Sequence, residues 1–285
     1  MSFGSPYMTI PRFSYLKPHS VSEAIELLEK YGDDAKVKAG GIGIIAFMKE
    51  RLTSASYIVD LKGIPELGMI QESNGYLRIG ATVTLRRLEE MRNMKLRSLH
   101  EAVSSIADPI IRQSATLVGD TCEAIPWVDA PPALISLDAK ALVAGKKGTR
   151  DIPVSQLIKG TGELSIGGSE IITEISIPEN GGKSTYVKFA SGSEYSIASA
   201  SVRVDPENTR LVIVMGAVAE SPRIFDQSSV EWKWGESVEK NIRMVWKAFD
   251  DRLEPMSDML SSSEFRLKVS KMVVARALKE LFGGA

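Results

Sequence analysis

The chain has 285 residues, of which 44% are hydrophobic and 25% are charged, so it is long enough for two or three packed units and is not intrinsically disordered. Its 35 basic and 36 acidic side chains give a net charge of -1, which argues against binding to nucleic acid or to an anionic membrane surface. One cysteine, Cys122, excludes an intrachain disulfide and an iron–sulfur cluster held by this chain alone, and with only two histidines we expect no metal site.

Targeting segments are not evident. The longest apolar run, Ile42 to Met48, is far shorter than the roughly 20 residues that a membrane-spanning helix needs. The N-terminus lacks a basic region followed by a hydrophobic one, so we expect no signal peptide. A cytoplasmic protein with no transmembrane segment is therefore predicted.

The first sixty residues predict a β-turn-α-β unit behind a leading helix. Ser20 and Glu23 form a capping box that opens this helix, and Gly32 ends it. Alternating or apolar-periodic patterns then predict a strand at 35–39, a Gly40-Gly41 turn, a helix at about 44–52 and a strand at 57–60.

The middle of the chain mixes strands and helices without regular alternation. The patterns predict strands at 77–81, 140–144, 150–152 and 170–177, with helices at 84–91, 96–107 and 131–137. Pro109 is expected to break the second of these helices. Thr116 to Asp120 is expected to form a turn, and Gly145 to Gly148 to join two paired strands.

Turn-forming residues at 179–183 predict a domain boundary. The expected N-terminal domain spans 8–178, with subdomains of about 8–60 and 61–178, and the C-terminal domain spans 183–285. The second domain is predicted to contain an antiparallel sheet of strands at 184–190, 197–204 and 210–218, with helices at 238–253 and 263–282. The predicted fold class is α+β.

Gly41, Gly43 and Ala46 satisfy a G-x-G-x-x-A pattern between a strand and a helix, and Asp60 lies where a ribose-binding acid would follow. This pattern favours a nicotinamide-binding Rossmann unit, although a helix precedes the strand. A second interpretation treats 38–43 as a loop that holds a diphosphate through main-chain N–H groups, for which glycine permits close approach. A third is a helix-entry turn without a ligand.

The segment from Ile106 to Val143 contains a second candidate loop, Thr116 to Asp120, and a helix opened by Asp129-Ala-Pro-Pro. Its order resembles the ATIGGN…D-x-P-x-A-L-x-x-L-D-A signature of the FAD-binding medium subunits of molybdenum hydroxylases, which include the carbon monoxide dehydrogenase medium subunit and the xanthine dehydrogenase FAD subunit. Further landmarks in the same order are Gly80-Ala-Thr-Val-Thr-Leu85, Glu170 to Pro178, and Ser263 to Arg266. The resemblance implies the two-subdomain, PCMH-like FAD-binding domain of molybdopterin dehydrogenases, followed by a small α+β domain.

The resemblance also implies the cofactor-binding residues. The first loop would be Lys38, Ala39, Gly40, Gly41, Ile42 and Gly43, and the second Thr116, Val118, Gly119 and Asp120. Asp129 would reach a sugar or ribityl hydroxyl group, with helix N-capping as the alternative, and Lys188 would approach the flavin, with an exposed strand lysine as the alternative. Ile106 and Ile172 would neighbour the ring system, with a place in the hydrophobic core as the alternative. No catalytic residue and no metal ligand is expected.

Four features depart from this family's pattern. Val118 replaces a glycine and Asp120 an asparagine, so we expect steric and charge repulsion to weaken FAD binding, and we expect Val118→Gly with Asp120→Asn to tighten it. Ile42 replaces a histidine, and Ser191-Gly192 a basic pair. Cys122 is expected to serve packing.

The implied function is that of an FAD-carrying electron-transfer subunit in a hetero-oligomer. It would take electrons from a small subunit with [2Fe-2S] clusters, while a large subunit holds the molybdenum cofactor and oxidises the substrate, and it would pass them to an external acceptor. One alternative is a cofactor-poor or cofactor-free paralogue with a structural or regulatory role. Another is an independent nicotinamide-dependent oxidoreductase.

Overall fold

The computed structural model describes residues 10–91, 96–179, 182–191, 195–205 and 209–283. The start of the predicted N-terminal domain at residue 8, residues 180–181 of the predicted boundary, and Gly192 lie outside these ranges. The α+β class predicted from the sequence is confirmed, since helices accompany sheets that are mainly antiparallel.

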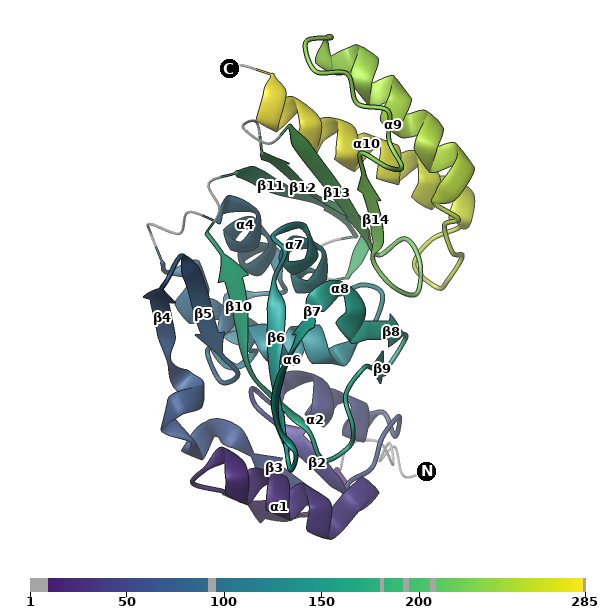
Figure 1. Ribbon diagram of the computed structural model, residues 1–285. Coiled ribbons are helices and arrows are strands. Elements are labelled where there is room, and N and C mark those ends of the chain that lie inside the picture. The colour runs from purple at the N-terminus through teal and green to yellow at the C-terminus, as the bar shows by residue number, and fades with distance from the viewer. Residues whose placement is uncertain (1–9, 92–95, 180–181, 192–194, 206–208, 284–285) are drawn as a thin grey trace, which may run out of the picture.

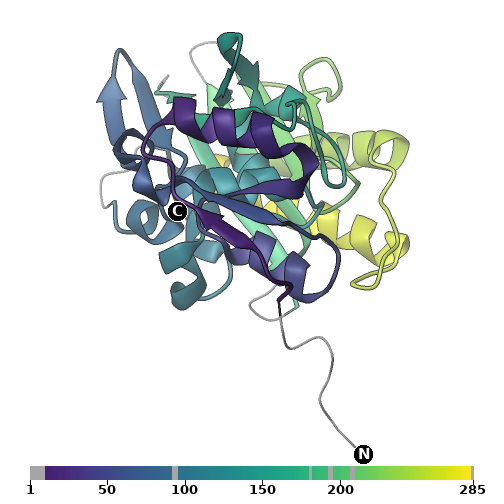
Figure 2. The same ribbon diagram turned by 90° about the horizontal axis from the view of Figure 1, so that it is seen from below.

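The N-terminal unit contains a three-stranded parallel sheet in the order β1-β3-β2. Figure 2 shows α1 and α2 on opposite faces of this sheet. Neighbouring residues of β3 reach the two sides, since Ile58 clusters with Met48 of α2 while Val59 clusters with Leu28 of α1. The serine half of the capping box is confirmed, because Ser20 Oγ accepts from Glu23 N at 3.1 Å, whereas the Glu23 carboxylate accepts from His19 N and not from Ser20 N. The bounds are β1 Ser14–Leu16, α1 Val21–Tyr31, β2 Ala35–Lys38, α2 Ile42–Lys49 and β3 Tyr57–Asp60, with 3₁₀ turns at Gly32–Asp34, Leu61–Gly63 and Pro65–Gly68.

The middle unit is a five-stranded antiparallel sheet in the order β4-β5-β10-β6-β7, accompanied by short helices. Pro109 does not merely end a helix. It is the first residue of α5, whose N–H groups at 110 and 111 donate to Asp108. The strands are β4 Ile70–Ser73, β5 Tyr76–Gly80, β6 Lys140–Gly145, β7 Gly148–Pro153 and β10 Ile171–Pro178, with β8 Ile158–Gly160 and β9 Glu163–Leu164 forming a separate pair. The helices are α3 Leu85–Glu89, α4 Arg97–Ser105, α5 Pro109–Ser114, α6 Leu117–Glu123, α7 Ala130–Ser136 and α8 Val154–Leu157.

The C-terminal unit is a four-stranded antiparallel sheet in the order β11-β12-β13-β14. Helices α9 and α10 cover one face, and α4 and α7 of the middle unit lie against the other (Figure 1). All ten residues of β12 are buried as a result, so this strand is packed on both faces. The bounds are β11 Lys183–Ala190, β12 Ser196–Asp205, β13 Arg210–Gly216, β14 Arg223–Asp226, α9 Val238–Arg252 and α10 Ser263–Phe282.

Two large hydrophobic clusters correspond to these parts of the chain. The first includes the middle sheet and α1, together with Val212 and Val214 of β13, and the second joins β11 to β14 with α9 and α10. The two clusters therefore meet at the C-terminal sheet. None of the described helices is long and apolar enough to span a membrane.

Candidate functional site

The first predicted loop leaves β2 at Lys38 and enters α2 at Ile42, two residues before the predicted start of that helix. Gly41 has a φ of 95°, which favours glycine. A Cβ on Gly40 would overlap the carbonyl oxygen of Ser114 and lie 3.0 Å from the Cα atom of Ala115. Glycine at position 40 thus lets the first loop lie against the chain that enters the second.

The second predicted loop is not a turn, and that expectation is wrong. Thr116 is the N-cap of α6, and its Oγ1 atom accepts from Gly119 N at 3.0 Å. Residues 117–120 are already helical, so none of them needs the positive φ that a valine resists. Gly119 N–H is bonded inside the helix, so a ligand at this loop would compete with Thr116 for it.

Val118 is 5% exposed and belongs to the first hydrophobic cluster. The expected steric block by its side chain therefore has no support, because the isopropyl group lies in the core. The expected gain in FAD affinity from Val118→Gly loses its basis as well, since the substitution would leave a cavity in the core and weaken α6.

Asp120 is partly buried, and its Oδ2 atom accepts from Ala130 N at 3.1 Å. Burial, followed by the nearby Glu123 and Asp129 carboxylates, raises the pKa of Asp120 well above its usual value. This shift favours the neutral form of the carboxyl group. The charge repulsion expected between Asp120 and a diphosphate is therefore reduced.

Asp129 lies at the junction between the middle unit and the C-terminal sheet. Its carboxylate accepts from Tyr186 OH at 2.5 Å, from Ser196 Oγ at 2.6 Å and from Lys188 Nζ at 2.8 Å. Asp129 is the N-cap residue of α7, as the alternative predicted, but its side chain makes no capping bond to that helix. Lys188 Nζ also donates to Ser105 O at 2.7 Å, and its side chain is only 14% exposed, which contradicts the alternative of an exposed strand lysine.

The two predicted ring neighbours, Ile106 and Ile172, are 8% and 3% exposed and belong to the first hydrophobic cluster. Ile106 follows α4, where three successive carbonyl groups receive hydrogen bonds from cations. Lys188 donates to Ser105 O, while Arg112 Nη1 donates to the carbonyls of Ile106 at 2.8 Å and Ala107 at 3.0 Å. The cations satisfy carbonyls that the end of a helix leaves without partners.

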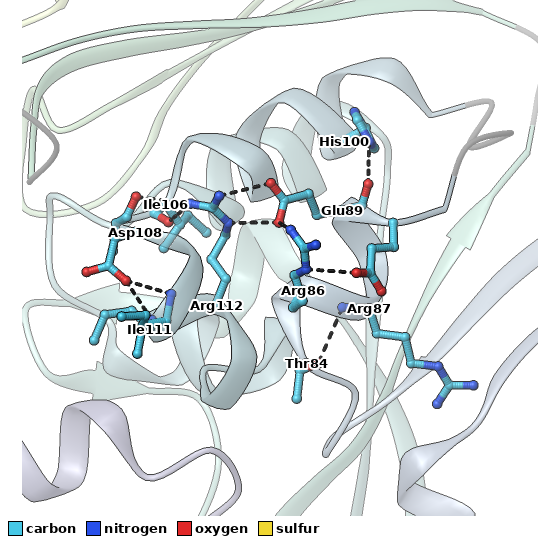
Figure 3. Close-up of polar contacts among 12 residues, drawn as sticks. Thr84, Arg86, Arg87, Glu89, His100, Ile106, Asp108, Ile111 and Arg112 are labelled. Carbon is cyan, nitrogen blue, oxygen red and sulfur yellow. Dashed lines mark hydrogen bonds and ion pairs between the residues drawn. The ribbon is translucent and has the colours of Figure 1, made fainter.

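Arg112 is held in turn by a two-point contact with Glu89 of α3, at 2.9 and 3.1 Å (Figure 3). The hydrogen bond with Arg112 lowers the pKa of Glu89. Burial raises this pKa, but the bond with Arg86 lowers it further, and the net effect is a lowered pKa. Figure 3 also shows His100 of α4 beside the main chain of Glu89. Arg112 is not among the site residues predicted from the sequence, because the approach of α3 to α5 is a tertiary contact.

Lys38 and Asp60 form an ion pair at 3.1 Å, and Tyr15 OH donates to the same carboxylate. Burial raises the pKa of Asp60, but hydrogen bonds from Tyr15, Lys62 N and Lys38 outweigh it and leave the pKa lowered. This carboxylate is engaged by the protein rather than open to a ribose. A strand, β1, precedes α1, but the strand order β1-β3-β2 differs from the 3-2-1 order of a Rossmann half, so the unit does not favour the Rossmann interpretation.

Glu123, the last residue of α6, was not singled out from the sequence. Its carboxyl group lies against Gly43, where a Cβ would sit 2.7 Å from Glu123 Cδ. Burial raises the pKa of Glu123 to about 7. The thiol of Cys122 has its pKa raised to about 12 by burial and by Glu123, which suits the packing role expected for it.

The residues present suit an anionic diphosphate held by the main chain. Two glycine positions, 40 and 43, leave no room for a Cβ, and α2 begins without a side-chain cap, so its first N–H groups point out of the helix. Among the described residues no cluster of three or more metal-ligating side chains is found.

Solved structures share this fold over nearly the whole chain. The molecule superimposes on a chain of carbon monoxide dehydrogenase from Hydrogenophaga pseudoflava, in a form that lacks the Mo-pyranopterin moiety of the molybdenum cofactor. The TM-score is 0.89 at 27% identity, covering 97% of this chain and 99% of that one. Fold and site define the class: a cofactor-binding subunit of an oxidoreductase built from several chains.

Sequence comparison narrows this class. Residues 11–180 match the FAD binding domain in molybdopterin dehydrogenase, and the chain belongs to this family. The carbon monoxide dehydrogenase medium chain of Hydrogenophaga pseudoflava is 35% identical over 60% of each chain. The glyceraldehyde dehydrogenase medium chain of Sulfolobus acidocaldarius is 26% identical over 95% of this chain and 99% of its own length. The resemblance read from the sequence and the FAD cofactor it implied are confirmed at the level of the family.

Proposed function

We propose that this chain is the FAD-carrying electron-transfer subunit of a molybdenum hydroxylase. In this proposal an iron–sulfur small subunit supplies the electrons, a large subunit holds the molybdenum cofactor, and an external acceptor receives the electrons. The proposed setting is the cytoplasm. The medium-chain names of the relatives support an assembly with larger and smaller chains.

The single observation that carries the proposal is the contact of Gly40 with Ser114 and Ala115, the residues that lead into α6. It brings the open start of α2 beside the start of α6, so one diphosphate could reach both. When bound, FAD supplies reversible one-electron and two-electron redox chemistry. The protein then has to bind and orient the cofactor and to place charge near it.

The main chain of Gly40 to Gly43 would hold the diphosphate through its N–H groups. Thr116 would contribute its hydroxyl hydrogen, since its oxygen already accepts from Gly119. Lys188 would supply positive charge near the flavin, and Asp129 and Ser105 fix the position of its Nζ atom. Asp129 could accept from a cofactor hydroxyl only by giving up one of its three present donors.

The test is reconstitution of the purified chain with FAD, followed by gel filtration and absorption spectroscopy. We expect near-ultraviolet and blue absorption that co-elutes at about one FAD per chain and is released on denaturation. Gly40→Val is the loss-of-binding variant, and Gly160→Val is the matched control, because no atom lies within 4 Å of a Cβ at position 160. A chain that stays colourless after reconstitution would instead favour the cofactor-free paralogue.

The partners are tested separately by co-expression with candidate small and large subunits. The proposal expects one stable complex whose bound FAD is reduced when substrate is added. Reduction of the isolated chain by substrate, without the other subunits, would contradict it.

A further inference from the structure

The Glu123 carboxyl group occupies the space beside Gly43. Gly43 is the second residue of α2, and a Cβ there would lie 2.7 Å from Glu123 Cδ and 3.1 Å from Glu123 Cγ. This contact joins the end of α6 to the beginning of α2. An acidic side chain thus stands at the loop to which the proposed function assigns the FAD diphosphate.

The start of α2 attracts both a carboxylate and a diphosphate. The helix has eight residues, and its N-cap, Gly41, offers no side-chain acceptor to the first N–H groups. Those groups and the helix dipole favour negative charge. A carboxylate from Glu123 and a diphosphate would compete for them, and the two anions would repel each other at this distance.

No neighbouring cation balances Glu123 within the described part of the chain. Lys188 is paired with Asp129 and Arg78 with Glu174 of β10. Lys38, whose side chain lies against Gly41, is paired with Asp60. On α6 itself the other titratable groups are Asp120 and Cys122, which are acids and cannot supply positive charge. Glu123 forms no hydrogen bond or ion pair with any described residue.

On the basis of the proposed function, we propose that Glu123 makes the affinity for FAD depend on the uptake of one proton by its carboxyl group. The neutral carboxyl group is compatible with a diphosphate at the start of α2. The ionised group opposes it by charge, because its carboxylate lies in the space beside Gly43. The proton comes from solvent, and no bond other than O–H is made or broken.

The direction of the effect follows from the geometry and from the burial that raises the pKa of Glu123 to about 7. FAD should bind more tightly below this pH and more weakly above it. A single linked proton limits the change to about tenfold in Kd per pH unit. By reciprocity, bound FAD raises the pKa of Glu123 further.

The experiment measures the Kd for FAD by equilibrium dialysis at pH 6, 7 and 8, at constant ionic strength. Three proteins are compared: wild type, Glu123→Gln, and the control Glu50→Gln. Glu50 is an exposed glutamate at the other end of α2, so its variant makes the same chemical change away from the loop. Circular dichroism verifies that each variant is folded.

We expect the wild-type Kd to rise about fivefold between pH 7 and pH 8, because the carboxyl group is about half ionised at pH 7 and almost fully ionised at pH 8, with Glu50→Gln following the wild type. Glu123→Gln should show a nearly flat profile and should bind FAD about tenfold more tightly than wild type at pH 8. A flat wild-type profile, or an unchanged slope in Glu123→Gln, overturns the proposal. An absence of FAD binding at all three pH values overturns the proposed function itself, which distinguishes the two failures.

Discussion

The Asp129–Lys188 pair joins the middle unit to the C-terminal sheet, and its removal should have a large effect on stability. The two side chains are 6% and 14% exposed, and their charged atoms are 2.8 Å apart. At an effective dielectric constant of about 20, the Coulomb attraction at that separation is on the order of 6 kcal/mol. Desolvation opposes most of it, but removal of one partner leaves the other charge buried.

Asp129→Asn would remove the negative charge that balances Lys188, whose side chain is only 14% exposed to solvent. We expect a loss of about 3 kcal/mol in the free energy of unfolding. Lys188→Met should cost less, about 2 kcal/mol, because Tyr186 and Ser196 still donate to the carboxylate. The coupling energy from the double-mutant cycle should be about 2 kcal/mol.

Urea unfolding followed by circular dichroism measures the cycle on wild type, the two single variants and the double variant. The exposed Glu264–Lys268 pair, with its side chains 80% and 70% exposed, is the matched control and should couple by less than about 0.5 kcal/mol. The reasoning is refuted if the Asp129–Lys188 coupling is no larger than that of the control pair.

Three further predictions concern other parts of the site. Burial raises the pKa of Glu123 from 4.5 to about 7 in the folded chain, so the folded state holds this proton more tightly than the unfolded state. The resulting contribution to the free energy of unfolding is fully present below pH 4.5 and is lost as the pH rises through 7. Glu123→Gln should therefore gain roughly 2 to 3 kcal/mol over wild type at pH 8 and little at pH 4.5, and equal gains at both pH values in urea titrations would contradict this. Gly40→Ala should lower stability by about 2 kcal/mol, while Gly160→Ala should stay within about 0.5 kcal/mol of wild type in the same assay. Arg112→Lys keeps the positive charge but loses the planar guanidinium group that binds Glu89 and two carbonyl groups. Thermal unfolding should show that the free energy of unfolding falls by about 2 kcal/mol, and an unchanged midpoint would argue against the network in Figure 3.

Elements with a strong local pattern could be predicted closely from the sequence. The final helix was predicted at 263–282 and lies at Ser263–Phe282, and the helix predicted at 238–253 lies at Val238–Arg252. In both, a serine N-cap and an apolar stripe act within a few residues of one another. The hairpin at Gly145–Gly148 was predicted for a similar reason, since a short turn determines the pairing of its own strands.

Elements that depend on distant partners were missed. Strand β1 has three residues and exists through its pairing with β3, more than forty positions along the chain. Helix α6 was taken for a turn, because a threonine and a glycine favour either a turn or a cap. Its seven residues are stabilised by packing, since Leu117 and Val118 are buried in the first hydrophobic cluster.

The family, the fold class and the first glycine-containing loop, at Gly40 and Gly41, could be identified from the order of residues along the chain, whereas the second predicted loop is the start of α6. Tertiary structure alone decided where the charges lie: Asp129 pairs with Lys188 across the junction, Lys38 with Asp60, and Glu123 lies against Gly43. Backbone propensities act over a few neighbouring residues, so a sequence reveals them directly. Ion pairing and burial depend on which distant segments pack together, and they set the pKa values on which the behaviour of this site depends.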